Sequence, residues 1–226
     1  MLHDCLARYA DEGAFAALAV YTDLPDPLAA ATGLHELVRH LYWEDKNLPA
    51  VVFFATAAIQ HGLTAADALK DMDQADELRG VTKATCYDLA SFTWPGWGEP
   101  TMNPGDTDRH TGLHAARLNL ELARSLGRDD RALSRAHWVL AAQHLAADRH
   151  IDARRGFVRA AQRLAEGDHA PERLLNEGYT ALTDLVAGAA DDGPLLDITS
   201  RLRDGLPGGA GFADQLDTAR GVFAPA

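Results

Sequence analysis

Apolar residues recur along most of the chain at the three- and four-residue spacing of an α-helix, and no segment alternates between apolar and polar positions as a strand does. This pattern predicts an all-α protein. Helices are expected at residues 2–20, 29–43, 49–61, 64–92 (with possible breaks near Gly80), 108–126, 130–147, 151–166, 171–189, 194–204 and 212–222.

The breaks between these segments have recognisable turn chemistry. Residues 22–27 contain two prolines, and residues 44–47 form a short polar turn. Gly62 is expected to end the helix that begins near Pro49, and Thr64 to cap the next one. Short turns place consecutive helices antiparallel, so the pattern predicts helix hairpins.

We expect one helical domain over residues 1–226. Residues 1–28 form an N-terminal helix and linker in this interpretation, residues 29–190 form the hairpins with an inserted loop at 94–107, and residues 191–226 form C-terminal helices. A chain of 226 residues with 47% hydrophobic residues is long and apolar enough to bury a core.

The formal net charge of −12 disfavours nucleic acid and anionic membranes as partners. The charge is uneven, because residues 114–226 hold 14 of the 21 basic residues, all of them Arg. The two cysteines have no disulfide or zinc spacing, and the N-terminus lacks a signal-peptide pattern. The apolar stretch 49–59 is too short to span a bilayer. A cytoplasmic location is therefore expected.

An A-x3-F-x2-A pattern occurs twice in the chain. It comprises Ala153, Phe157 and Ala160 in one copy, and Ala50, Phe54 and Ala57 in the other. Each copy follows a helix with apolar residues at regular spacing.

These segments, residues 31–62 and 134–166, resemble tetratricopeptide repeat units, in which two antiparallel helices pack closely through small residues. A weaker copy with Ala116, Leu120 and Ala123 lies between them, and its first helix would end at Phe92. The resemblance implies a short solenoid of stacked hairpins. The alternative is an irregular helical bundle with Ala-rich interfaces.

In that family the first helix of each pair lines a groove that binds peptides or other partners. The corresponding positions here are His35, Arg39, Tyr42, Trp43, Arg135 and Trp138. Trp, Tyr and Arg are frequent anchors of binding surfaces. The alternative is that Trp43 and Trp138 belong to the core.

The loop after Phe92 carries Trp94 and Trp97, held by Pro and Gly. These two indoles are expected either to form an aromatic wall for a ligand or to plug one end of the helical stack.

His110 and His114 have the i,i+4 spacing that could share a metal, and Asp106 and Asp108 lie just upstream. Both imidazoles could equally be solvated. No metal or other cofactor is expected, since a third and fourth ligand are not apparent.

Arg155, Arg159 and Arg163 form a stripe at i,i+4 spacing that could grip an acidic partner, and the alternative is a solvated face. His137 and His144, seven residues apart, share a helix face, and His144 is expected to pack as an aromatic residue.

Nucleotide-binding and common catalytic motifs are absent from the sequence. The leading hypothesis is a non-enzymatic binding or scaffold module with an aromatic-lined groove for a peptide, a protein segment or a small ligand. The alternatives are a small helical enzyme or biosynthetic accessory protein with a pocket near His110 and His114, and a structural protein that self-associates.

Overall fold

The computed structural model of the chain describes residues 1–165 and 169–224. Within these residues it contains eleven α-helices, one short 3-10 helix and no strand, so the predicted all-α fold class is confirmed. The chain divides into two compact units, Met1–Thr93 and Trp94–Ala226. The single domain expected over residues 1–226 stays a prediction.

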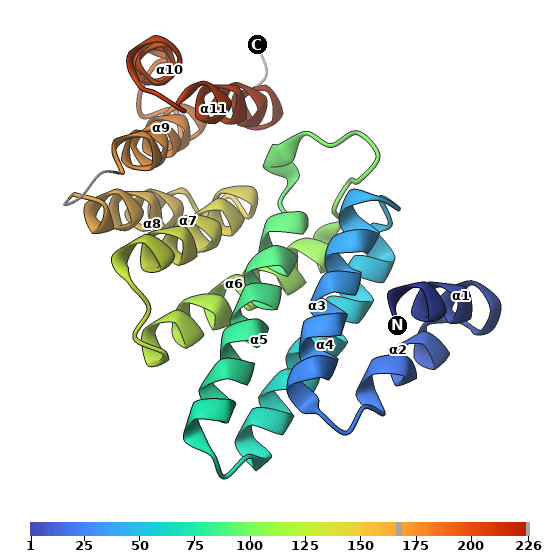
Figure 1. The fold of residues 1–226 in the computed structure, drawn as a ribbon. Coiled ribbons are helices and arrows are strands. Elements are labelled where there is room, and N and C mark those ends of the chain that lie inside the picture. Colours follow the sequence, from blue (N-terminus) through green and yellow to red (C-terminus); the bar gives the residue numbers. More distant parts are fainter. Residues whose placement is uncertain (166–168, 225–226) are drawn as a thin grey trace. The chain divides into compact units, whose positions relative to one another are not determined.

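The first unit contains α1 to α5. These helices span α1 Leu2–Glu12, α2 Ala14–Thr22, α3 Pro27–Trp43, α4 Leu48–Ala68 and α5 Met72–Phe92. Helices α3, α4 and α5 pack against one another and lie side by side in alternating directions (Figure 1). Leu34, Leu37, Leu41 and Phe54 are fully or almost fully buried among them.

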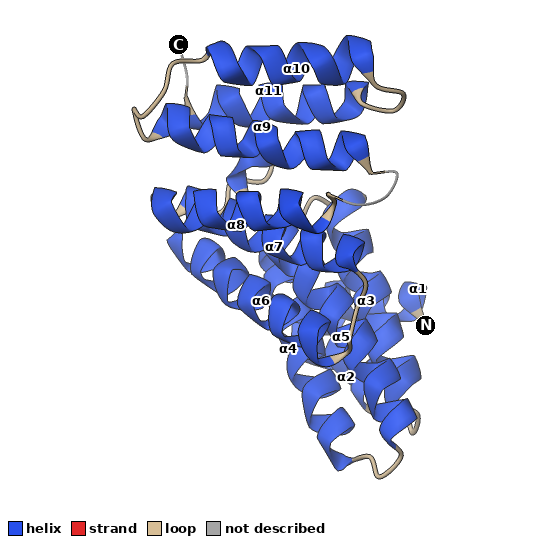
Figure 2. Cartoon of the chain, turned by 90° about the vertical axis from the view of Figure 1, so that its left-hand side faces the viewer, coloured by secondary structure: helices blue, strands red, loops and turns tan. Residues whose placement is uncertain are grey.

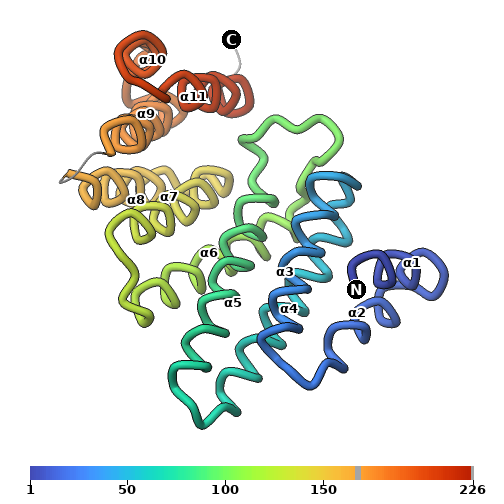
Figure 3. Tube along the Cα trace, in the orientation of Figure 1, coloured from blue at the N-terminus to red at the C-terminus, as the bar shows by residue number. Residues whose placement is uncertain are grey.

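The second unit begins with the short helix η1. Its elements are η1 Pro95–Trp97, α6 Asp106–Ser125, α7 Asp130–Ala146, α8 His150–Arg163, α9 Ala170–Val186, α10 Gly193–Gly205 and α11 Ala210–Phe223. Each helix from α6 to α10 packs against the next, and α11 packs against α9, α10 and η1. Figure 2 shows α10, α11 and α9 one above another, over α8 and α7. Figure 3 traces the long irregular connection from η1 into α6.

Two predicted boundaries are wrong in the first unit because glycine has more than one structural use. The expected helix 2–20 is divided at Gly13, whose φ of 91° suits glycine and interrupts the helix. Gly62 does not end α4. It is buried in the helix, and a Cβ at this position would overlap the Thr82 hydroxyl, so Gly62 allows α4 and α5 to approach closely.

Thr64 therefore lies inside α4, and the predicted cap at this residue is also wrong. The cap of α5 is Asp71, whose carboxylate accepts hydrogen bonds from the backbone N–H groups of Asp73 and Gln74 at 3.0 and 3.2 Å. Helix α5 then continues through Gly80 without a break. The helices expected after residue 107 are found within a few residues of their predicted bounds, except that the end expected at residue 166 lies outside the described residues.

Helix α4 is longer than the apolar stretch 49–59 suggested. With 21 residues, it is long and apolar enough to cross a membrane, as judged by length and composition alone. Core helices of soluble proteins meet the same criterion, and Val51, Phe54 and Ala55 are completely buried within the first unit.

Candidate functional site

A cavity of about 550 Å³ lies among α6, α7 and α8 of the second unit. Its lining is mostly polar and basic. The lining residues are Arg124, Asp130, His137, Arg159, Gln162, Arg163 and Ala165, and we call this site the arginine pocket. A volume of this size falls in the range of small-ligand sites.

Close helix packing holds the walls of the arginine pocket in place. Leu120 and Ala123 of α6 form a buried cluster with Ala136 of α7. On the other wall, the Ser134 hydroxyl of α7 donates a hydrogen bond of 2.8 Å to the carbonyl oxygen of Ala160 in α8. The three helices therefore present their polar side chains from a packed framework rather than from loops.

The positive charge of the pocket is only partly compensated by the residues that the structure describes. Arg163 donates to the Asp130 carboxylate at 2.9 Å, so these two charges offset each other. Arg124 and Arg159 form no ion pair with any residue that the structure describes. Two guanidinium groups are thus left to face a ligand.

His137 supplies a neutral polar group in the same wall. The residue is 4% exposed, and its ring nitrogens make no hydrogen bond to the described part of the chain. Burial lowers its pKa to about 4, and the nearby charges of Arg124, Arg159 and Arg163 lower the pKa in the same direction. The imidazole is therefore neutral at pH 7, with one nitrogen able to donate and the other to accept.

These features together suit an anion. Guanidinium groups bind carboxylates and phosphates through paired N–H donors, and the Gln162 amide and the His137 N–H add uncharged donors. The uncompensated positive charge disfavours a metal cation in this pocket.

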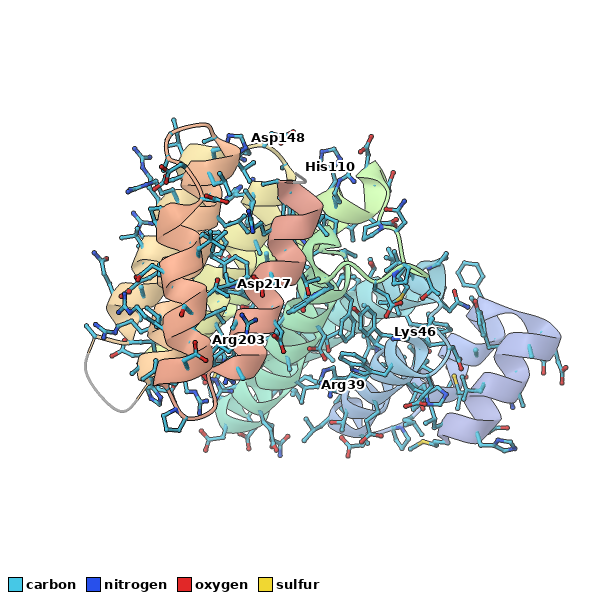
Figure 4. All side chains as sticks on the ribbon, turned by 90° about the horizontal axis from the view of Figure 1, so that it is seen from above. Arg39, Lys46, His110, Asp148, Arg203 and Asp217 are labelled. Carbon is cyan, nitrogen blue, oxygen red and sulfur yellow. The ribbon has the colours of Figure 1, made fainter. Side chains whose placement is uncertain are left out.

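Four of the sequence-predicted residues lie together in the first unit, on α3. His35 and Arg39 both contact the buried carboxylate of Asp88 in α5, where His35 Nε2 lies 2.9 Å and Arg39 Nη1 3.3 Å from Asp88 Oδ2. Figure 4 labels Arg39, and also Lys46 in the turn that follows α3. These contacts join α3 to α5 and orient His35.

Tyr42 and Trp43 differ in exposure. The ring of Tyr42 is buried and stacks on Phe92 with centroids 3.6 Å apart, whereas Trp43 is 54% exposed. The Lys46 ammonium lies 5.4 Å from the centroid of the Trp43 ring. Tyr42 therefore has a packing role, and Arg39 and Trp43 remain accessible within this unit.

The predicted tryptophans of the second unit are mainly core residues. Trp94 is 1% exposed and its ring lies 5.6 Å from Trp138 and 5.8 Å from Tyr179. Trp97 is partly exposed. Its ring packs edge-on against Trp94 and lies at a tilt to the ring of Trp138. This cluster gives the indoles a structural role, and any contact between them and a ligand stays a prediction.

Arg135 is engaged within the protein. It donates to Glu172 at 2.9 Å, and Arg131 binds the same carboxylate. Hydrogen bonding to Arg131 lowers the pKa of Glu172, and Arg135 adds to this effect. Arg135 thus links α7 to α9.

His110 and His114 are both exposed on α6, and neither lines the arginine pocket. Figure 4 labels His110 near the start of this helix. In residues 1–165 and 169–224, no group of three or more His, Cys, Asp or Glu side chains is arranged to hold a metal ion.

Comparison with protein-family models, with curated proteins and with solved structures returned no match. The resemblance to tetratricopeptide repeats therefore rests on the sequence motifs.

Part of the arginine pocket has a signal in the sequence. All three arginines of the predicted stripe are exposed, as the solvated-face alternative expects, and Arg159 and Arg163 line the pocket, whereas Arg155 does not. Arg124 and Gln162 were missed, because an isolated Arg near a helix end and a Gln among arginines carry no sequence signal. His137 was noted only for sharing a face with His144.

Proposed function

We propose that this protein is a non-enzymatic binding module that holds an acidic group in the arginine pocket. The group belongs to a small ligand or to a segment of a partner protein. The observation that carries this proposal is the presence of two unpaired guanidinium groups, Arg124 and Arg159, beside a buried imidazole that has no partner in the described chain.

The overall charge restricts which anions reach this pocket. At a net charge of −12, the protein repels nucleic acids and anionic membranes over several ångströms, so long polyanions are disfavoured. A small anion or a single acidic side chain presents much less charge to the rest of the surface. The pocket therefore favours a compact ligand.

We also propose that α3 with α4, and α7 with α8, are tetratricopeptide-like hairpins. In both pairs the aromatic residue of the motif, Phe54 or Phe157, is fully buried, and Ala50, Ala153 and Ala160 are buried beside it.

The function is tested by titrating the protein with phenyl phosphate and with benzoate in a calorimeter at pH 7.5. Wild type is expected to bind at least one of these probes. Arg159→Gln should weaken that binding roughly tenfold or more, because one charge-assisted hydrogen bond contributes about 1.5–3 kcal/mol.

Arg155→Gln is the matched control, since Arg155 lies one turn away on α8, is exposed and does not line the pocket. It should bind as wild type does. The absence of binding for both probes, or equal losses in the two variants, would reject the proposed site.

A further inference from the structure

Counted over the described residues that line it, the arginine pocket carries close to two positive charges at neutral pH. Arg124, Arg159 and Arg163 contribute three positive charges, and Asp130 contributes one negative charge beside Arg163. His137 contributes none, because the low pKa of its imidazole keeps it neutral. A ligand group with two negative charges would neutralise this charge, whereas a single carboxylate would leave one positive charge uncompensated.

The hydrogen-bonding groups of the pocket also exceed what a carboxylate accepts. A guanidinium offers a planar fork of N–H donors, and the pocket adds the Gln162 amide and the His137 N–H. These donors come from three helices, so they surround a ligand group rather than lie in one plane with it. A carboxylate has two oxygens in one plane, but a phosphate has three outward oxygens in a tetrahedral arrangement.

The imidazole of His137 adds an uncharged donor to the pocket, beside arginine side chains that are exposed. His137 is 4% exposed, yet it lines the cavity and makes no hydrogen bond to the described residues. Its ring nitrogens are not among the fully enclosed polar atoms that lack a partner, so they can be reached from the cavity. A ligand oxygen in the pocket would accept from its N–H.

We infer that the arginine pocket recognises the dianionic form of a phosphate monoester, with Arg124, Arg159 and His137 donating to the phosphate oxygens. This inference rests on the proposed function and names the ligand group that the site takes. Gln162 and Arg163 line the pocket from α8, as Arg159 does, and add further N–H donors for the phosphate. The cavity of about 550 Å³ has room for an organic group beyond the phosphate.

A phosphate monoester can come from a small metabolite or from a phosphorylated side chain of a protein. The recognition chemistry is the same for both sources. The two sources differ in the atoms attached to the phosphate, because the backbone of a phosphorylated peptide must lie across the opening of the pocket.

The test compares phenyl phosphate with phenyl sulfate by calorimetry. The two probes have nearly the same shape, but at pH 7.5 the first carries close to two charges and the second carries one. Phenyl phosphate is expected to bind roughly tenfold more tightly or better. At pH 5.0 its phosphate gains a proton, so the ratio of the two affinities should fall toward one while the pocket keeps its charge.

Two variants test the charge argument itself. Arg159→Gln lowers the pocket charge by one and should reduce the preference for phenyl phosphate over phenyl sulfate, whereas Arg155→Gln should retain the preference. Asp130→Asn raises the pocket charge by one and should tighten the binding of phenyl phosphate. Circular dichroism of each variant establishes that the helices are intact.

A seven-residue phosphoserine peptide with neutral flanking residues identifies the source. Tighter binding of this peptide than of phenyl phosphate indicates a phosphorylated protein segment, and weaker binding indicates a small phosphate ester. Either result supports the inference if the unphosphorylated peptide does not bind. Equal binding of phenyl sulfate, benzoate and phenyl phosphate at pH 7.5 would overturn the inference while leaving the proposed function in place. Failure of every probe would reject both.

Discussion

His137 shows how a single residue acquires its properties from its surroundings. In the sequence it is one of ten histidines, and only its spacing to His144 sets it apart. In the structure it is almost fully buried next to three arginines, and both conditions oppose its protonation. The resulting neutral imidazole is a hydrogen-bonding group, and the arginines provide the charge.

The lowered pKa of His137 predicts a specific dependence of stability on pH. The folded state binds a proton only near pH 4, whereas the unfolded chain binds one near pH 6.5. Above about pH 6.5 the imidazole is neutral in both states, so it makes no contribution to the pH dependence of stability. As the pH decreases from 6.5 toward 4, only the unfolded chain takes up the proton, and the free energy of unfolding therefore falls.

His137→Leu should remove this dependence. Between pH 7 and pH 4.5, wild type is expected to lose about 1–2 kcal/mol more stability than the variant, after discounting for solvent that reaches the ring from the pocket. Urea unfolding of both proteins at the two pH values measures the difference. Parallel losses in the two proteins would show that His137 titrates normally in the folded state.

At the scale of elements, the hairpin of α7 and α8 depends on small residues. Ala153 and Ala160 are fully buried, and a Cβ added at Gly156 would lie 2.6 Å from the Cβ of Ala141 in α7. Helices that approach this closely have no room for larger side chains. Because the same helices form two walls of the arginine pocket, their spacing also sets the positions of Arg159 and His137.

Ala153→Leu and Ala160→Leu are each expected to destabilise the protein by roughly 1–3 kcal/mol through overpacking. Ala10→Leu is the control, since Ala10 is an exposed position of α1 and the substitution should change stability little. Thermal unfolding of the three variants checks this prediction. Unchanged melting of both α8 variants would mean that the two helices do not meet as closely as described.

The existence of the helices could be predicted from the sequence, but some of their ends could not. Apolar periodicity identified the segments, and the bounds of α7 and α10 lie within one residue of those expected. Gly13 and Gly62 were misassigned because a glycine can end a helix, interrupt it or sit at a close helix contact. Only the neighbouring helix, through Thr82 for Gly62, determines which of these applies.

At the scale of the whole molecule, the arginine pocket has no linear motif. Its residues come from α6, α7 and α8, and the unpaired Arg124 and Arg159 are 35 positions apart in the sequence. Sequence patterns show which residues share one helix face, as for Arg159 and Arg163. They do not show which faces of separate helices meet. The aromatic residues illustrate the same limit, because the sequence leaves open whether Trp94 forms a ligand wall or plugs the helical stack, and only the structure shows that it is buried.

The distribution of charge follows the two compact units. The second unit holds most of the arginines, and the first unit holds few basic residues and many acidic ones. Because Arg124, Arg159 and Arg163 are exposed, salt screens their charges, and the affinity for an anion is expected to fall as the ionic strength rises. This arrangement agrees with a compact anionic ligand.

The central claim is that an anion binds in the arginine pocket, and the most direct measurement is a nuclear magnetic resonance titration of the arginine side-chain Nε–H signals with phenyl phosphate. The account predicts that the signals of Arg124, Arg159 and Arg163 shift with one common dissociation constant, while those of Arg155 and Arg39 stay in place. Shifts confined to Arg39, or small shifts spread over all arginines, would contradict it.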